Sequence, residues 1–200
     1  DLFSKQETKD YCLGMVYGMR AYYYFIMYRN YGGVPLRLVP DVENGNYDVS
    51  TLYKGRAKAS EVLAQIKSDI QKSLQYFGSQ TTFNFNGSKN NAKYYWSKAA
   101  TEMLAGEVYL WSAKVAVGDQ AAAPADLATA KTHFQNVVNN YDLSLQPNFE
   151  DVFSTSNRRN SELIFALAYS ETEASNPLPQ QYCYNMLTGG ATTGVAYDIT

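Results

Sequence analysis

The chain is poor in the residues on which metal centres and disulfide frameworks depend. Its 200 residues include 2 cysteines and 1 histidine. Cys12 and Cys183 form no C-x2-C spacing and have no histidine close by in the sequence, so a metal site is not expected. The pattern predicts two buried thiols and leaves open whether they pair.

Charge is also scarce, because Asp, Glu, Lys and Arg make up 18% of the chain and the formal net charge is −2. Because the chain has no excess of basic residues, nucleic acid and acidic membrane surfaces are not expected partners. No apolar run approaches the ~20 residues of a membrane helix, and no secretory segment opens the chain. Because the chain begins at Asp1 without methionine, we expect an excerpt whose targeting signal lies upstream.

Catalytic arrangements are absent from the sequence pattern. A glycosidase needs two carboxylates about 5 to 10 Å apart, and every adjacent acidic pair lies in an expected loop or at the end of an expected element. These pairs are Glu171 with Glu173, Asp41 with Glu43, and Glu150 with Asp151. His133 has no Cys or Asp arranged with it as nucleophile or orienter, and Gly87-Ser88-Lys89 lacks the upstream glycine of a phosphate-binding loop. We expect no enzyme and no cofactor.

Tyrosine, in contrast, is abundant. The chain has 18 tyrosines against 9 phenylalanines, and 46% of its residues are hydrophobic. A tyrosine side chain combines an apolar ring with a hydroxyl, which suits neutral, hydroxylated ligands. A chain of this length can bury roughly two-thirds of its unfolded surface, so we expect one domain or a large piece of one.

Apolar residues at spacings of three and four predict four helices. The first runs from about Lys9 to Asn30, and in its run of tyrosines 22–24 at least one ring faces the core, because successive side chains point about 100° apart. Its predicted buried stripe is Cys12, Met15, Val16, Met19, Tyr23, Ile26 and Met27. The second helix begins at a Ser60 cap, with Glu61 at the positive end of the dipole. Its predicted buried residues are Val62, Leu63, Ile66, Ile70 and Leu74.

The third and fourth helices follow a polar loop over residues 78–92. Ser97 is the expected cap of the third, with Ala100, Leu104, Val108, Trp111 and Val115 facing inward. Asp126 is the expected cap of the fourth, with Leu127, Ala130, Phe134, Val137, Val138 and Tyr141 facing inward. The apolar run from Ser161 to Tyr169 then predicts a short strand, and a loop rich in Pro, Gln, Gly and Thr follows it.

These elements form a helix pair over residues 9–77, a second pair over 97–141, and a strand and loop region over 142–200. Tetratricopeptide repeats place Leu-Gly-x2-Tyr on a first helix and Ala-x3-Phe on a second. The first pair carries Leu13, Gly14 and Tyr17 in that spacing, and the second pair carries Gly106, Tyr109, Ala130 and Phe134. The helix over 60–77 lacks the Ala-x3-Phe pair. We interpret the chain as two divergent repeats with insertions.

Four segments, in order, resemble the SusD/RagB-like outer-membrane glycan-binding proteins of Bacteroidetes-type bacteria. Arg20 to Pro35, RAYYYFIMYRNYGGVP, is similar to the family's RAxxYFxLxxxYGxVPL. Val62 to Leu74 resembles VxxxIxxDLxxAxxxL, with Asp69 at the Asp position. Ser97 to Leu110 resembles a tkxAAxxLLAxVYL helix, and Tyr141 to Phe165 resembles YxLxxNYxxLFxxxNxxxxEiIF. The basic residue that usually precedes the third helix corresponds to Lys93 or Lys98.

The resemblance implies a mainly α fold of tetratricopeptide-like helix pairs in a SusD-like α-α superhelix, with long loops and one or two short strands. Residues 1–200 are then a single SusD-like domain fragment. It also implies a non-enzymatic, surface-exposed outer-membrane protein, held by an N-terminal lipid anchor absent from this chain. Such a protein binds oligo- or polysaccharides and delivers them to a TonB-dependent SusC-like transporter for nutrient uptake. The alternative is a tetratricopeptide-like protein-interaction scaffold without glycan binding.

Sugar recognition stacks aromatic rings on pyranose faces and uses amides and hydroxyls for the sugar hydroxyls. The candidate glycan contacts are Tyr182, Tyr184, Asn185, Gln181, Tyr197 and Trp96. All but Trp96 lie in the loop after the predicted strand. Trp96 follows Tyr94 and Tyr95, and this trio either contacts sugar or packs beneath the helix start as a hydrophobic staple. Glycan contacts vary within the family, so none is carried over.

Overall fold

A computed structural model describes residues 3, 5–40, 49–85, 88–90 and 93–167. The chain divides into two compact units, Asp1–Ala166 and Leu167–Thr200. Only Leu167 of the second unit is described, so the fold and the site below belong to the first unit. The prediction of a single domain fragment over residues 1–200 stays a prediction.

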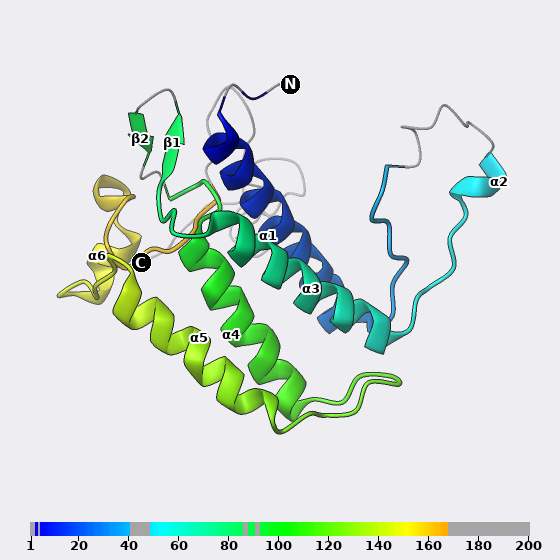
Figure 1. Cartoon of the computed structure of the whole chain (residues 1–200). Helices are drawn as coiled ribbons and strands as arrows, with labels where there is room; N and C mark the ends of the chain where they lie inside the picture. The colour runs from blue at the N-terminus through cyan, green and yellow to red at the C-terminus, as the bar shows by residue number, and fades with distance from the viewer. Residues whose placement is uncertain (1–2, 4, 41–48, 86–87, 91–92, 168–200) are drawn as a thin grey trace, which may run out of the picture. The chain divides into compact units, whose positions relative to one another are not determined.

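The described residues are mainly helical, as the sequence predicts, and four long helices dominate (Figure 1). These are α1 (Gln6–Tyr31), α3 (Ala59–Phe77), α4 (Lys98–Lys114) and α5 (Asp126–Asn140). The shorter elements are α2 (Val49–Leu52), α6 (Phe149–Phe153) and the 3-10 turn η1 (Thr155–Asn157). Strands β1 (Phe83–Phe85) and β2 (Ser88–Asn90) pair antiparallel. The sequence predicts neither α2 nor this hairpin.

The helices pack as two pairs, α1 along α3 and α4 along α5, with α3 joining the pairs through α4 (Figure 1). Local signals set their ends. The Ser97 hydroxyl accepts the backbone N–H of Ala100 at 3.2 Å, which confirms the predicted cap of α4. Gly32 ends α1 with a φ of 68°, a conformation that side-chain-bearing residues rarely adopt.

The other two predicted caps are wrong. Helix α3 begins at Ala59, and its first turn is held by the Glu61 carboxylate, which accepts the backbone N–H of Lys58 at 2.9 Å. Ser60 lies inside that turn and hydrogen-bonds Asp119 instead. Asp126 is the first residue of α5 and accepts hydrogen bonds from Lys67 and Ser112. Both residues therefore link separate elements rather than cap their own.

The predicted buried stripe of α1 is only partly right, because Met15, Met19 and Met27 pack against the core but no member of the stripe is fully buried. Val16 is 61% exposed and Tyr23 51% exposed, and the remaining members of the stripe are only partly buried. The residues that face the core lie one position away, at Tyr11, Gly14, Gly18, Ala21, Tyr24, Phe25 and Tyr28. Glycines and alanine permit close approach of neighbouring helices and rings. Close packing against α3 and Trp96 therefore decides the orientation of α1, and raw hydropathy does not.

On the other helices the predicted stripes are largely confirmed. Val62, Leu63, Ile66 and Ile70 on α3 are buried, as are Ala100, Leu104 and Val108 on α4 and Ala130 and Val137 on α5. The exceptions are at the rim of α5, where Leu127 is exposed and Val138 is 75% exposed. Helix α5 packs only along α4 among the described helices, so a narrow stripe suffices to bury it.

The strand predicted from Ser161 is also wrong for the residues that the structure describes. Residues 161–167 form turns and irregular chain, and residues 168 and 169 lie outside the described part. The buried side chain of Asn160 organises this region. Its Oδ1 accepts the N–H groups of Glu162 and Leu163, and its Nδ2 donates to the carbonyl of Val152 at 3.0 Å. An apolar run bent by such a side chain does not extend into a strand.

The two helix pairs repeat one set of contacts. Gly14 faces the Phe77 ring, where an added Cβ would lie 2.9 Å from Cγ, and Gly106 faces the Phe134 ring, where it would lie 2.6 Å from Cδ1. Tyr17 stacks on Tyr76 with ring centroids 5.6 Å apart. Tyr109 stacks on His133 at the same 5.6 Å. This correspondence confirms the two divergent repeats predicted from the sequence.

The correspondence also shows what replaces the Ala-x3-Phe pair that the helix over 60–77 lacks. Ser73 and Phe77 occupy in α3 the positions that Ala130 and Phe134 occupy in α5. The Ser73 hydroxyl donates to the carbonyl of Gly14 at 2.7 Å, which satisfies the buried polar group that replaces alanine's methyl. A search for Ala-x3-Phe misses this repeat, because its small residue is a serine.

Candidate functional site

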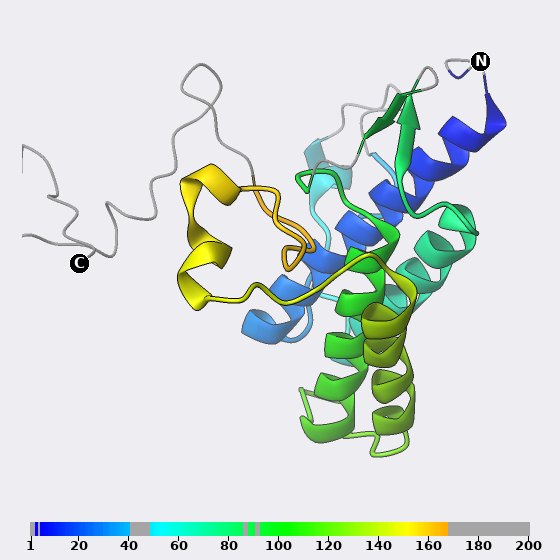
Figure 2. The ribbon, with the colours of Figure 1, turned by 90° about the vertical axis from the view of Figure 1, so that its left-hand side faces the viewer.

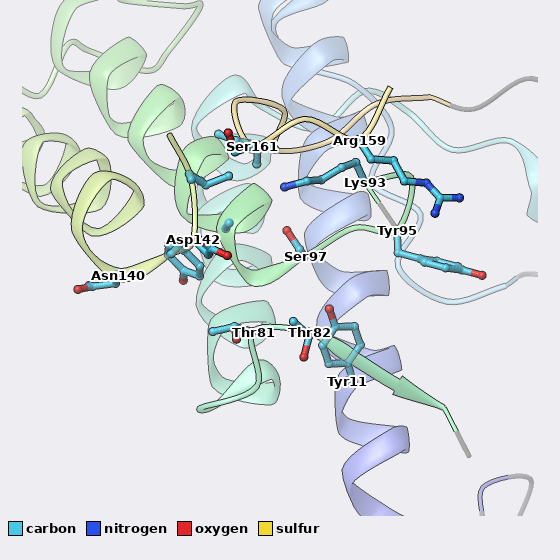
Figure 3. Close-up of a pocket in the computed structure, with 14 residues that line it drawn as sticks. Tyr11, Thr81, Thr82, Lys93, Tyr95, Ser97, Asn140, Asp142, Arg159 and Ser161 are labelled. Atoms are coloured by element: carbon cyan, nitrogen blue, oxygen red, sulfur yellow. The ribbon is translucent and has the colours of Figure 1, made fainter. Parts of the chain in front are cut away.

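A cleft of about 560 Å³ lies where the ends of several elements meet (Figure 3). Each wall is short in sequence and belongs to a different part of the first unit. The lining residues are Tyr11 on α1, Thr81 and Thr82 after α3, Lys93, Tyr95, Ser97 and Ala99 at the start of α4, Asn140 to Leu143 at the end of α5, and Arg159, Ser161 and Ile164. The cleft therefore combines rings, hydroxyls, an amide and charged groups.

One wall is anchored in the core by Tyr11. Its side chain is 2% exposed, and its ring meets Phe77 edge-on with centroids 4.9 Å apart. Burial, together with the neighbouring Cys12, raises the pKa of Tyr11 to about 12. The phenol is therefore neutral at physiological pH and offers a hydroxyl rather than a charge.

The segment before α4 is held in place by Trp96. Its indole Nε1 donates to the hydroxyl of Thr101 at 2.8 Å, and its ring meets Phe165 at a centroid distance of 5.2 Å. The backbone N–H of Ala166 donates to the carbonyl of Lys93 at 2.9 Å. In Figure 2 the orange end of the described chain lies beside the start of α4, in agreement with these contacts. Two walls of the cleft are thus tied together.

A pair of tyrosine rings stands beside this segment. Tyr94 is exposed, and its ring lies 4.8 Å from that of Tyr95, which lines the cleft. Figure 3 shows the Tyr95 ring on one side of the cleft with the Tyr11 ring below it. Exposed or half-exposed rings next to hydroxyls are the usual elements of a surface that receives sugars.

The charged groups of the cleft are Lys93, Arg159 and Asp142. Burial lowers the pKa of Lys93, and the negative charge of Asp142 acts in the opposite direction. In Figure 3 the Lys93 amine extends toward the side of Ser97 and Asp142, whereas the guanidinium of Arg159 lies toward Tyr95. The two cations therefore occupy different sides of the cleft.

Of the predicted glycan contacts, only Trp96 lies among the described residues. Tyr182, Tyr184, Asn185, Gln181 and Tyr197 lie outside the described residues, and so does Cys183. Trp96 is 3% exposed, and its one donor is already bonded. Stacking on a sugar needs an exposed ring face, so its burial contradicts the prediction of Trp96 as a glycan contact. The alternative, packing beneath the helix start, is what the structure shows.

His133 lies between α4 and α5 and outside this cleft. Its Nδ1 lies 2.6 Å from an oxygen of the buried Glu102, and its ring stacks on Tyr109. These contacts give the only histidine of the sequence a packing role. Within the part of the chain that the structure describes, no three residues of metal-binding type gather at one place.

For several lining residues, no pattern in the sequence indicates that they belong to a site. Thr81, Thr82 and Asp142 are ordinary loop residues and Asn140 is an ordinary polar residue at the end of α5 until the helices bring them to one place. Arg159 carried a weak signal, since it belongs to the pair Arg158-Arg159 in a chain with few charges. Lys93 was singled out only for its place in the family pattern.

The comparisons with known proteins agree with this fold. Residues 2–110 match the model of a SusD-like family described as starch-binding and associating with the outer membrane. Because this match covers more than half of the 200 residues, the chain belongs to the SusD-like family. No protein with a curated description matches the sequence significantly.

Solved structures of SusD superfamily proteins are similar to the chain. A SusD superfamily protein of Bacteroides fragilis NCTC 9343 is 48% identical, with a TM-score of 0.79 over 94% of this chain and 36% of its own. NanU of B. fragilis is 39% identical, with a TM-score of 0.74 over 90% of this chain and 33% of its own. A superfamily protein of Bacteroides vulgatus ATCC 8482 is 37% identical, with a TM-score of 0.71 over 86% and 32%. The chain thus spans about a third of the length of these relatives.

Proposed function

We propose that this protein binds oligo- or polysaccharides at the cell surface without transforming them, and that the cleft beside α4 contributes to the binding. The observation that carries the proposal is the composition of the cleft, in which the partly exposed Tyr95 stands among hydroxyl and amide groups. Family membership supports it, because the family is described as starch-binding.

The size of the cleft suits one or two sugar units rather than a long chain. A volume of about 560 Å³ falls within the roughly 300–1,000 Å³ of small-ligand sites. A polysaccharide would therefore place a short stretch in the cleft and extend beyond it. Separately from the cleft, the loop residues Tyr182, Tyr184, Asn185, Gln181 and Tyr197 remain proposed glycan contacts.

The carboxylates of the cleft support a binding role over a catalytic one. Hydrolysis of a glycosidic bond generally uses two carboxylates on either side of the bond. Among the described residues that line the cleft, Asp142 is the single acidic residue. Glu150 and Asp151, one of the pairs considered from the sequence, lie on α6 and do not line the cleft.

The role extends, in our proposal, to delivery of the glycan to a SusC-like TonB-dependent transporter for nutrient uptake. The family description of association with the outer membrane supports this location. Among the residues that the structure describes, no helix has the length and hydropathy to cross a bilayer. We propose that the protein is held at the surface by an N-terminal lipid anchor.

Binding to a panel of polysaccharides, measured by affinity electrophoresis and calorimetry on the full-length protein, tests the proposal. Tyr95→Ala should weaken binding of the recognised glycan by about 10-fold, because a stacked aromatic anchor contributes more than about 1 kcal/mol. Tyr31→Ala is the matched control, since Tyr31 is 68% exposed at the end of α1 and does not line the cleft.

Three results would be informative. Loss of affinity in Tyr95→Ala alone supports the cleft, whereas equal affinity in all three proteins removes it as the site. If no polysaccharide binds, the glycan role itself fails. Pull-down from outer membranes then separates the two functional classes, since recovery of a barrel transporter supports delivery, and a different protein partner supports the interaction scaffold.

A further inference from the structure

The cleft has more positive than negative charge. Lys93 and Arg159 both line it, and Asp142 is the one carboxylate among its described lining residues. Lys93 and Asp142 attract each other electrostatically. In Figure 3 the Lys93 amine extends toward the side of Asp142, and Arg159 lies on the side of Tyr95. No lining carboxylate is then left to balance the guanidinium of Arg159.

We propose that this cleft binds an anionic glycan, with a carboxylate or sulfate group on Arg159 and a sugar ring against Tyr95. A guanidinium presents two parallel N–H donors that match two oxygens of such a group. Thr81 and Thr82 line the same cleft and offer hydroxyls to the remaining sugar hydroxyls. The inference rests on the proposed function, because it names the class of sugar for the same site.

The attraction for an anion at this site is local. The protein carries a formal net charge of −2, so its overall field does not attract anions. Recognition of an acidic group must therefore come from local charges. Arg159, which provides the unbalanced charge, is exposed. Its attraction for an anion is therefore screened by salt.

Calorimetric titration of the full-length protein with three probes tests the inference. The probes are oligogalacturonate, which carries carboxylates, a chondroitin sulfate oligosaccharide, which also carries sulfate, and maltoheptaose, which is neutral. Three variants are compared with the unaltered protein. Arg159→Gln removes the proposed contact, Asp142→Asn removes the neighbouring negative charge, and Arg158→Gln removes an equal charge from a residue that does not line the cleft. Melting temperatures check that each variant is folded.

We expect at least one acidic probe to bind, with an affinity that falls about 10-fold or more in Arg159→Gln and hardly changes in Arg158→Gln. Asp142→Asn should tighten binding of that probe about 3-fold by removing a repulsive charge. Raising the salt from about 20 to about 200 mM should weaken binding of that probe to the unaltered protein, because the Debye length shortens about 3-fold. Binding of maltoheptaose, if present, should be the same in all four proteins.

The contrary results separate the two proposals. If neutral glycans bind in a Tyr95-dependent manner while neither acidic probe binds, the anionic class is overturned and the glycan role stands. If an acidic probe binds equally well to Arg159→Gln and to the unaltered protein, the assignment to Arg159 is overturned. If the protein binds neither these probes nor any polysaccharide of the panel, the proposed function fails, and the inference fails with it.

Discussion

Gly18 is the position at which one added methyl group should disturb both the core and the cleft. It lies on the buried face of α1, against the indole of Trp96. A Cβ at this position would overlap Trp96 Nε1 and would lie 2.8 Å from both Trp96 Cδ1 and Thr101 Oγ1. Trp96 and Thr101 are themselves buried and hydrogen-bonded to each other, so neither can move without cost.

The expected loss in Gly18→Ala follows from three terms. Overpacking of a core costs about 1–3 kcal/mol, and separating the indole N–H from its partner leaves a buried donor unsatisfied at about 1–3 kcal/mol. Alanine is better than glycine inside a helix by about 1 kcal/mol, which offsets part of this. We expect a net decrease of about 3 kcal/mol in the free energy of unfolding.

Urea unfolding followed by tryptophan fluorescence measures the effect. Gly55→Ala is the control, because an added Cβ there meets nothing within 4 Å. The double variant Gly18→Ala with Trp96→Phe should lose at least about 1 kcal/mol less than the sum of its single variants, since phenylalanine has no Nε1 to clash with. If Gly18→Ala proves as stable as Gly55→Ala, the close approach of α1 to Trp96 is refuted.

Three further predictions concern ionisable groups. Arg20 donates to both oxygens of the fully buried Asp69 at 2.7 Å. Arg20→Met should therefore cost about 3–5 kcal/mol in urea unfolding, and adding Asp69→Asn should restore part of it; an unchanged midpoint in Arg20→Met would contradict the role of the pair. Burial raises the pKa of Asp126, but hydrogen bonds from a lysine of α3 and from Ser112 outweigh it and hold the pKa below its ordinary 3.8. The stability that Asp126 contributes is present above about pH 4 and is lost as the pH falls through the folded-state pKa. Ser112→Ala should reduce that acid dependence of the unfolding midpoint, and an identical acid profile would argue against the bond. Because burial raises the pKa of Tyr11 to about 12, the stability it contributes is complete below about pH 10 and is lost as the pH rises toward 12. Tyr11→Phe should flatten this alkaline loss, which reaches about 1.4 kcal/mol by pH 11, measured as unfolding midpoints between pH 9 and 11, and an equally steep loss would contradict the assignment.

The positions of the helices are predictable from the sequence because their signals are local. Helix α1 ends near the predicted Asn30, and Ser97 precedes the first turn of α4 as predicted. The inward face of α1 is not predictable from hydropathy. Gly14 and Gly18 add little to an apolar pattern, yet they decide which rings can approach, so the more hydrophobic neighbouring stripe is only partly buried.

The cleft was predictable only in part. Tyr95 belongs to the aromatic cluster before α4, which the sequence marks as a candidate for sugar contact. The same cluster includes Trp96, whose burial depends on contacts with Thr101 and Phe165 from elsewhere in the chain. Thr81, Asn140 and Arg159 reach the cleft only through the packing of the helix pairs. Periodicity along the sequence does not predict which element ends come together in space. A site built from such ends can therefore be identified only from the folded structure.

The two repeated helix pairs differ most in the length of the chain that closes them. Residues 32–58 connect α1 to α3, whereas residues 115–125 connect α4 to α5. The first connection is more than twice as long, so closing it costs about 0.8 kcal/mol more in chain entropy. The α4–α5 pair should therefore form early in folding and α1 should join late. Since Tyr11 belongs to α1, the cleft is complete only when the slower pair has closed.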